Sequence, residues 1–159
     1  MLFCYIKKEG IIIKTTCIHC GRIVDKNHIC PMKINKKIKN RKDDSLYNTK
    51  RWKKLRKNIL DDYDNICLWS LYVQGKTLEA DRVHHIVEVL EDETLVYEYD
   101  NCFPLEKYNH YYIHELYKSR YKEQIRELLR KMLRDYNNGD RTLNKYKNDI
   151  EIIERKLGK

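Results

Sequence analysis

Three short stretches decide the fold of this chain: Val83-His84-His85-Ile86, Asp100-Asn101 and His110-Tyr111-Tyr112-Ile113-His114. Four of the six histidines fall within the 31 residues from His84 to His114, in the spacing H-H-x15-N-x8-H-x3-H. Histidine is the side chain that titrates near neutral pH, and it is also a common metal ligand. The clustering therefore indicates a chemical site, and the rest of the sequence can be interpreted around it.

The two histidines of the last stretch, His110 and His114, are four positions apart, so on a helix they share one face, about one turn apart. This spacing suits a common metal ion. In an extended segment, the side chains of His84 and His85 point to opposite sides. If His84 joins the ion, His85 stays free of metal, and a neutral imidazole can take a proton from water at pH 7. Three imidazoles leave coordination positions open for a phosphate oxygen and water.

This pattern resembles that of the HNH endonucleases, which have a ββα-metal fold. The resemblance covers residues 46–118 and is close to the nuclease domains of DNase colicins and of phage HNH proteins. It implies that His85 is the general base and that the side chain of Asn101 holds the loop bearing that base, which makes these two the candidate catalytic residues. The implied ligands of a divalent metal (Mg, Mn, Ni or Zn) are His84, His110 and His114.

The sequence departs from many phage members of this family, which bind a structural zinc through two C-x2-C pairs. Cys67 and Ser70 occupy the positions of the first pair, and Glu106 and Asn109 those of the second. We therefore expect that zinc to be absent. The apolar side chains expected to fill its space are Trp69, Phe103 and Tyr108. Many relatives also carry Asp where His84 stands, and the change to imidazole favours softer metal ions.

A second candidate metal site lies near the N-terminus, where four residues have the spacing C-x2-C-x7-H-x-C. Clustered cysteines in a chain without an export signal favour metal over disulfides. The predicted ligands of this structural zinc are Cys17, Cys20, His28 and Cys30. Gly21 would allow the tight turn of a zinc knuckle, whereas His19 as a ligand would strain it. The alternative is four reduced, unliganded side chains in a loop.

The charge is concentrated in one segment. Residues 33–57 contain twelve Lys or Arg and two Asp, a net charge of +10, whereas the rest of the chain sums to −1. Closely spaced cations bind polyanions through counterion release, although a solvated basic linker is the alternative. The residues predicted to contact DNA are Lys50, Arg51, Lys53, Lys54, Arg56 and Arg82. For Arg82, a salt bridge with Asp81 or Glu79 is an equal alternative to phosphate.

Residues 50–60 have the apolar spacing of a helix, with Asn48 or Thr49 as the N-cap. One face of this helix is apolar and the rest is cationic, which suits contact with the DNA backbone. The apolar face consists of Trp52, Leu55, Ile59 and Leu60.

Strands are predicted between residues 67 and 99, with a turn at 73–76, a second run over 78–90 and an acidic loop at 91–93. A helix begins within 105–110 and continues through Lys118 into an amphipathic segment. The apolar residues of that segment are Ile125, Leu128, Leu129, Met132, Leu133 and Tyr136. A turn at 137–140 precedes a last helix over 143–157.

These features predict an α+β fold with a small ββα-metal core. A zinc-knuckle-like module is expected at residues 1–32, a basic linker at 33–45, the HNH domain at 46–118 and a C-terminal helical extension at 119–159. The C-terminal helices are also a candidate homodimer interface.

The composition limits the class of protein. The chain has 159 residues, a net charge of +9 and 36% charged residues. It contains no run near the ~18 apolar residues that a membrane span requires, and the apolar N-terminal run is too short for a signal peptide. We therefore expect a cytoplasmic, bacterial or phage-encoded protein without a membrane partner.

The predicted function is metal-dependent hydrolysis of DNA phosphodiester bonds, by nicking or double-strand cleavage, to 5′-phosphate and 3′-hydroxyl ends. The alternative is a non-catalytic, zinc-containing nucleic-acid-binding protein or phage packaging accessory. Proteins of phage packaging or of the host are further expected partners of a phage-encoded protein. A protein that only binds DNA needs no metal-free histidine beside a metal site, so the pair His85 and Asn101 separates the two hypotheses.

Overall fold

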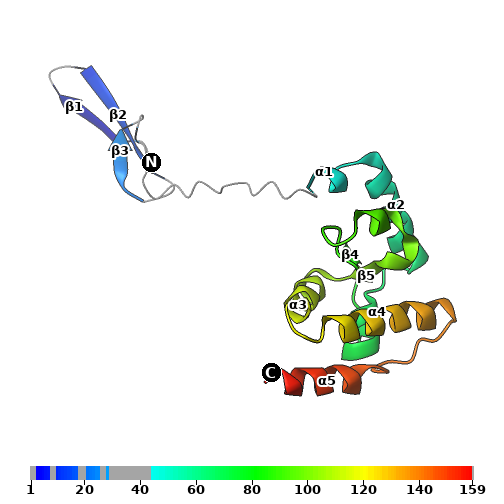
Figure 1. Cartoon of the computed structure of the whole chain (residues 1–159). Helices are drawn as coiled ribbons and strands as arrows, with labels where there is room; N and C mark the ends of the chain where they lie inside the picture. Colours follow the sequence, from blue (N-terminus) through cyan, green and yellow to red (C-terminus); the bar gives the residue numbers. More distant parts are fainter. Residues whose placement is uncertain (1–2, 8–9, 18–20, 26–27, 29–43, 159) are drawn as a thin grey trace. The chain divides into compact units, whose positions relative to one another are not determined.

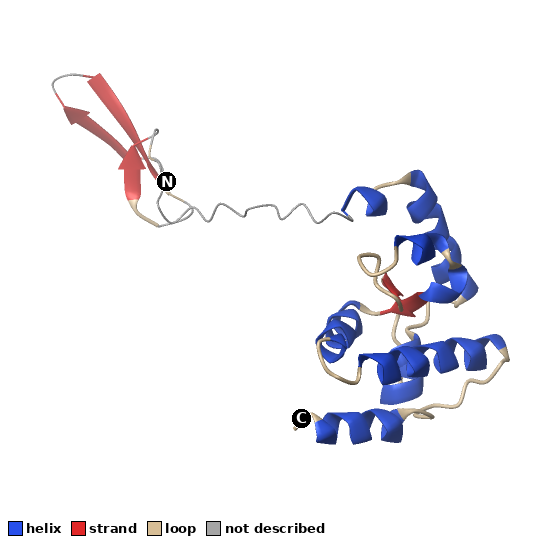
Figure 2. Cartoon of the chain, viewed as in Figure 1, coloured by secondary structure: helices blue, strands red, loops and turns tan. Residues whose placement is uncertain are grey.

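The computed structural model describes residues 3–7, 10–17, 21–25, 28 and 44–158. The chain divides into two compact units, Met1–Lys39 and Asn40–Lys159. The described part of the first unit contains strands, and the second unit contains helices and a small sheet (Figures 1 and 2). The combination confirms the predicted α+β class.

The first unit contains an antiparallel sheet in the order β1-β2-β3. Its strands are β1 (Phe3–Lys7), β2 (Gly10–Thr16) and β3 (Ile23–Asp25). The chain turns between β2 and β3 at Gly21, which has a φ of 69° and donates its N–H to the carbonyl of Cys17 at 2.8 Å. This positive φ favours glycine, and it fits the predicted reversal of the chain at Gly21.

The predicted zinc ligands are described only in part. The Cys17 side chain is half-buried and His28 is exposed, whereas Cys20 and Cys30 lie outside the described residues. The knuckle therefore stays a prediction. Residues 33–43 of the basic segment also lie outside the described part of the chain.

The elements of the second unit follow a helix–sheet–helix order. Its helices are α1 (Asp44–Tyr47), α2 (Lys50–Asp62), α3 (Lys107–Tyr117), α4 (Lys122–Asn137) and α5 (Lys147–Lys156). Its strands are β4 (Arg82–His85) and β5 (Cys102–Leu105). The short helical turns are η1 (Ser70–Gln74), η2 (Glu93–Tyr97) and η3 (Tyr99–Asn101).

Helix α2 forms as predicted. The Thr49 hydroxyl accepts the backbone N–H of Trp52 at 3.1 Å and caps the first turn. Trp52, Ile59 and Leu60 are buried and Leu55 is half-buried, so the helix packs its apolar face inward and exposes its lysines.

Strands β4 and β5 pair antiparallel, with His84 opposite Phe103 and His85 opposite Cys102. Helix α2 contacts both strands, and α3 contacts β4 (Figure 1). A two-stranded sheet cannot bury its own faces and needs packing against helices for stability. The sheet and α3 together form a ββα unit that presents β4 to α3.

The predicted strand at residue 67 is wrong. Residues 68–74 are helical and end in the π-helical turn η1, and the second predicted run over 78–90 is a strand only at Arg82–His85. Residues 67–72 are all buried, and a short run buried on every side has no periodicity that separates a strand from a helix. The chain then turns at Gly75, whose φ of 66° favours glycine. A Cβ at this position would also lie 2.5 Å from the Asn144 side chain.

The predicted continuous helix from residue 105 to Tyr136 is also wrong, because the chain breaks between α3 and α4. The Ser119 hydroxyl donates to the carbonyl of Leu116 at 2.6 Å and accepts the N–H of Tyr121 at 3.2 Å. Such bonds compete with the helical backbone ladder. The two flanking helices have the predicted character, and all six apolar residues predicted for α4 are buried.

The last helix begins at Lys147, four residues later than predicted. Asn144 has a φ of 60°, and its N–H donates to the carbonyl of Leu71 at 3.2 Å. This tertiary hydrogen bond holds the segment before α5 out of a helical conformation. The predicted turn at residues 137–140 is present, with Gly139 at a φ of 82°.

Hydrogen bonds join the four positions at which many phage HNH proteins carry cysteines. Asn109 donates from Nδ2 to the Cys67 sulfur at 3.4 Å, and Ser70 donates to the Cys67 carbonyl at 2.7 Å. Glu106 caps α3 through the N–H groups of residues 108 and 109. Trp69 and Phe103 are buried as predicted, but Tyr108 is 74% exposed and does not fill the core.

The helices in the described part of the chain are all too short or too polar to cross a bilayer.

Candidate active site

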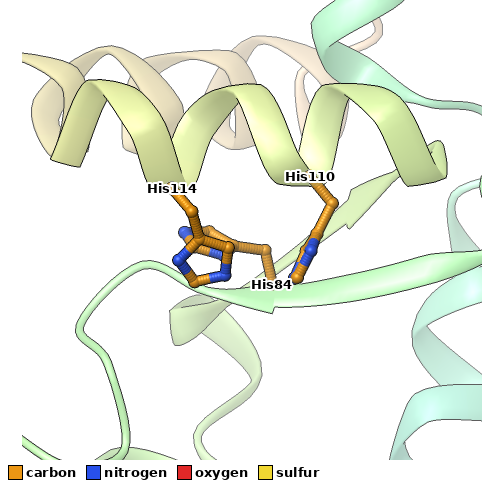
Figure 3. Close-up of side chains that lie close together, drawn as sticks. All are labelled: His84, His110 and His114. Carbon is orange, nitrogen blue, oxygen red and sulfur yellow. The ribbon is translucent and has the colours of Figure 1, made fainter. Parts of the chain in front are cut away.

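Strand β4 and helix α3 bring three histidines together at their contact. His84 lies on β4, and His110 and His114 lie one turn apart on α3 (Figure 3). One ring nitrogen from each of the three lies within 4.8 Å of the other two. The ring centroid of His84 is 5.3 Å from that of His110 and 4.9 Å from that of His114. We call these three residues the histidine cluster; they could hold one metal ion.

The most unusual atom of the cluster is Nε2 of His84. The residue is 2% exposed, and this nitrogen has no hydrogen-bond partner in the described part of the protein. Burial, and then the neighbouring His114 and His110, hold the pKa of His84 well below its ordinary value. The ring is therefore neutral at pH 7, and a buried, unpaired lone pair is costly unless something binds it.

The adjacent histidine, His85, faces a different element. Its ring stacks on Trp52 of α2 with centroids 4.7 Å apart, and it is 5% exposed. Its Nε2 lies 3.0 Å from the carbonyl oxygen of Val96. A carbonyl only accepts hydrogen bonds, so Nε2 donates, and the lone pair of the neutral ring is on Nδ1.

Asn101 holds the loop that follows β4. Its Oδ1 accepts the N–H of Val87 at 2.7 Å, and its Nδ2 donates to the carbonyls of Val87 and Leu95 at 3.0 and 3.2 Å. The backbone carbonyl of Asn101 also accepts the N–H of Ile86 at 2.8 Å. Asn101 therefore holds the loop between His85 and Val96 at both ends, at residues 86 and 87 and at Leu95. The carbonyl of Val96 is the one that His85 contacts.

A cleft of about 520 Å³ opens above these groups. Its lining combines the histidine cluster, His85 and Trp52 with three cations from α2 and β4: Lys53, Arg56 and Arg82. Glu88 and Glu91 also reach the wall. The cleft therefore joins metal-ligating nitrogens, a second imidazole and positive charge in one space.

The six residues predicted to contact DNA fall into two groups. Lys53, Arg56 and Arg82 line the cleft, whereas Lys50, Arg51 and Lys54 are exposed on α2 outside its lining. The guanidinium of Arg51 lies 3.7 Å from the centroid of the Tyr97 ring, a cation–π contact.

Both arginines that line the cleft contact Asp81. Arg56 donates to the Asp81 carbonyl at 2.6 Å, which ties α2 to the start of β4. The guanidinium of Arg82 lies 3.4 Å from the Asp81 carboxylate, and both side chains are half exposed. The salt-bridge alternative for Arg82 is thus present, and its exposure leaves it within reach of a ligand in the cleft.

Sequence reasoning misses two residues of this site. The helical pattern predicts Trp52 only as a core residue, yet it stacks on His85. Glu88 falls in a predicted strand, yet its carboxylate lies 3.3 Å from Nδ1 of His114. Neither contact has a local signal, because both join segments that are distant in the sequence.

No protein-family model matches the sequence, and no curated protein matches it either. Among solved structures, the chain is similar to the HNH endonuclease of the deep-sea thermophilic bacteriophage GVE2, solved with a manganese ion. The two share 26% sequence identity over 48% of this chain and 83% of the phage protein, with a TM-score of 0.45. This phage protein belongs to the family that the histidine pattern resembles.

The burial of His84 predicts a pH dependence of stability in the metal-free protein. The folded-state pKa of His84 is depressed, so below about pH 6.5 the unfolded chain binds a proton that folded His84 does not. As the pH is lowered below that value, the free energy of unfolding should therefore decrease, by up to about 1.4 kcal/mol per pH unit. In His84→Leu, which cannot titrate, this fall should be shallower. Urea unfolding of both proteins at pH 7.5 and 5.5 measures the difference, and equal slopes would contradict the assignment.

Proposed function

We propose that this protein is a metal-dependent endonuclease that hydrolyses phosphodiester bonds in DNA. The proposal rests on the histidine cluster, in which the buried Nε2 of His84 has no hydrogen-bond partner among the described residues. The next residue of the same strand, His85, contacts α2 and is not part of the cluster. A closed structural metal site needs no further imidazole beside it. A hydrolytic site needs a base that the metal does not occupy.

A divalent ion fits the cluster because the neutral ring of His84 offers a lone pair that no described protein group uses. The proposed ligands are His84, His110 and His114. When bound, the ion supplies positive charge that stabilises the phosphate and the leaving 3′ oxygen. Mg, Mn, Ni and Zn are the candidates, and an all-imidazole ligand set favours Ni or Zn over Mg.

His85 has the geometry of a general base. Its Nδ1 lone pair can accept a proton from the attacking water, while the Val96 carbonyl accepts the Nε2 hydrogen bond and stabilises the imidazolium that forms. Stacking on Trp52 limits rotation of the ring. In-line attack by this water would leave 5′-phosphate and 3′-hydroxyl ends.

The positive side chains of the cleft supply the contacts to the DNA backbone. Lys53 and Arg82 line the cleft beside the histidine cluster, and Lys50 and Lys54 extend the charge along the exposed face of α2. Contacts of this kind attract phosphates regardless of sequence. The proposed partner is therefore DNA, held by α2 with the scissile phosphate at the cluster.

A non-catalytic nucleic-acid-binding or packaging accessory protein is the second candidate, because the basic face of α2 serves binding as well as cleavage. The two candidates differ in their use of His85, which only the nuclease needs. Cleavage by a His85 variant therefore separates them.

His85→Ala should retain the metal ion and reduce the rate of plasmid cleavage by about 10²–10⁴-fold, the usual contribution of a positioned general base. The cleavage rate is measured by conversion of supercoiled plasmid with Mg, Mn, Ni and Zn in turn. His110→Ala is the matched control, since it should weaken ion binding and abolish activity. A wild-type rate in His85→Ala would remove His85 from the mechanism, and an inactive wild type with every ion would favour the binding protein.

Neutralising the exposed cations of α2 should weaken binding to duplex DNA of any sequence. In the variant in which Lys50, Arg51, Lys53 and Lys54 are all Gln, the slope of log affinity against log salt should become shallower by about 0.9 for each phosphate that the protein no longer neutralises. Fluorescence anisotropy with a labelled duplex measures this slope.

The control for this variant neutralises four exposed cations of α4 and α5: Lys131, Lys147, Arg155 and Lys156. Its salt slope should match that of the wild type. If the α2 variant binds with an unchanged slope, the DNA surface must lie elsewhere on the protein.

A further inference from the structure

The loop after β4 carries an acidic side chain against the histidine cluster that the proposed mechanism does not use. Glu88 lies on this loop, and its Oε1 is 3.3 Å from Nδ1 of His114. Its other carboxylate oxygen, Oε2, accepts a hydrogen bond from Lys122 at 2.8 Å. Glu88 thus connects an amine at the start of α4 to one of the proposed metal ligands on α3.

The orientation of Glu88 is fixed by a further network on the same loop. Lys122 also pairs with Glu91, and Glu91 accepts from Arg126 at 2.6 Å. Burial alone would raise the pKa of Glu91, but the hydrogen bonds from Lys122 and Arg126 lower it to about 2, so this carboxylate is charged at neutral pH.

This network is anchored to the backbone beside His85. Arg126 is 6% exposed and donates from Nε to the carbonyl of Ile86 at 2.9 Å. The Tyr117 hydroxyl donates to the same carbonyl at 3.0 Å. Both ends of the network therefore lie within the active-site loop, and Lys122 is held between two carboxylates of that loop.

We propose that Glu88 is a positioning residue for the metal ligand His114, and that Lys122 holds Glu88 in place. The inference rests on the metal site of the proposed function. A carboxylate only accepts hydrogen bonds, so next to Nδ1 it favours the tautomer with the proton on that atom. The lone pair of the neutral ring is then on Nε2, available to the ion, and the nearby negative charge makes the ring a stronger ligand.

A surface ion pair without function is the competing explanation for Glu88. Such pairs contribute little to stability. The geometry argues against it, because Lys122 contacts only one carboxylate oxygen of Glu88 and the other oxygen faces the imidazole. Glu88 is also unlike a fourth direct ligand, because its carboxylate contacts Nδ1 of His114 itself. An ion bound by both groups would lie between the carboxylate and the ring.

The test is the affinity of the full metal-free chain for Mn²⁺, measured by isothermal titration calorimetry. Glu88→Ala should bind Mn²⁺ about 10–100-fold more weakly than the wild type, the usual effect of removing a partner of a metal-bound histidine. Glu88→Gln keeps an accepting oxygen and should recover part of that affinity. Lys122→Met should weaken binding less than Glu88→Ala. Glu127→Ala, which removes an ion pair of α4 with Arg134, is the matched control and should bind as the wild type does.

A second readout follows the proton itself. The ¹⁵N chemical shifts of His114 should report the Nδ1–H tautomer in metal-free wild type and a shift toward Nε2–H in Glu88→Ala, a change that a merely structural role would not cause.

Three outcomes would overturn the proposal. If wild type and Glu88→Ala bind Mn²⁺ equally, Glu88 has no positioning role, although the metal site stands. If Glu88→Ala is as damaging as His114→Ala, Glu88 is a direct ligand. If the wild type binds no ion, the metal site of the proposed function fails, and the role of Glu88 fails with it.

Discussion

The unpaired Nε2 of His84 is the constraint on which the rest of the site depends. Leaving a buried polar atom without a partner costs about 1–3 kcal/mol, so a fold that keeps one needs a compensating interaction. The strand β4 buries this ring against α3, and α3 adds His110 and His114 on one face. Strand β4 pairs with β5 and packs against α3, and together these contacts gather the imidazole nitrogens in one place. A bound ion would convert this costly arrangement into a stabilising one.

The loop after β4 is held by hydrogen bonds from several elements of the second unit. Asn101 holds the backbone of Val87, while Arg126 and Tyr117 both donate to the carbonyl of Ile86. Trp52 covers His85 from α2. These contacts come from elements on different sides of the loop, so the side chains of the site are positioned before any ligand binds. Preorganisation of this kind lowers the cost of reaching a productive geometry.

Local patterns predicted much of the helical structure, and tertiary contacts account for the errors. The cap at Thr49 and the apolar face of α4 follow from short-range spacing, which a single sequence contains. The buried run of residues 67–72 has no periodicity, so its helical turn could not be separated from a strand. The break at Ser119 depends on a side chain competing with the backbone. The pattern of the histidines predicted that His84, His110 and His114 would meet, as their positions in the structure show, but the contact of Glu88 with His114 arises only when the loop folds against α3.

The proposed function requires that the histidine cluster binds one divalent ion through three imidazoles. Manganese K-edge X-ray absorption of the full chain, loaded with one equivalent of Mn²⁺, tests it most directly, because manganese prefers nitrogen and oxygen to the thiolates of the N-terminal unit. We expect a first shell with three imidazole nitrogens in the wild type and two in His110→Ala. A shell of oxygen atoms alone, or a spectrum that His110→Ala leaves unchanged, would contradict it.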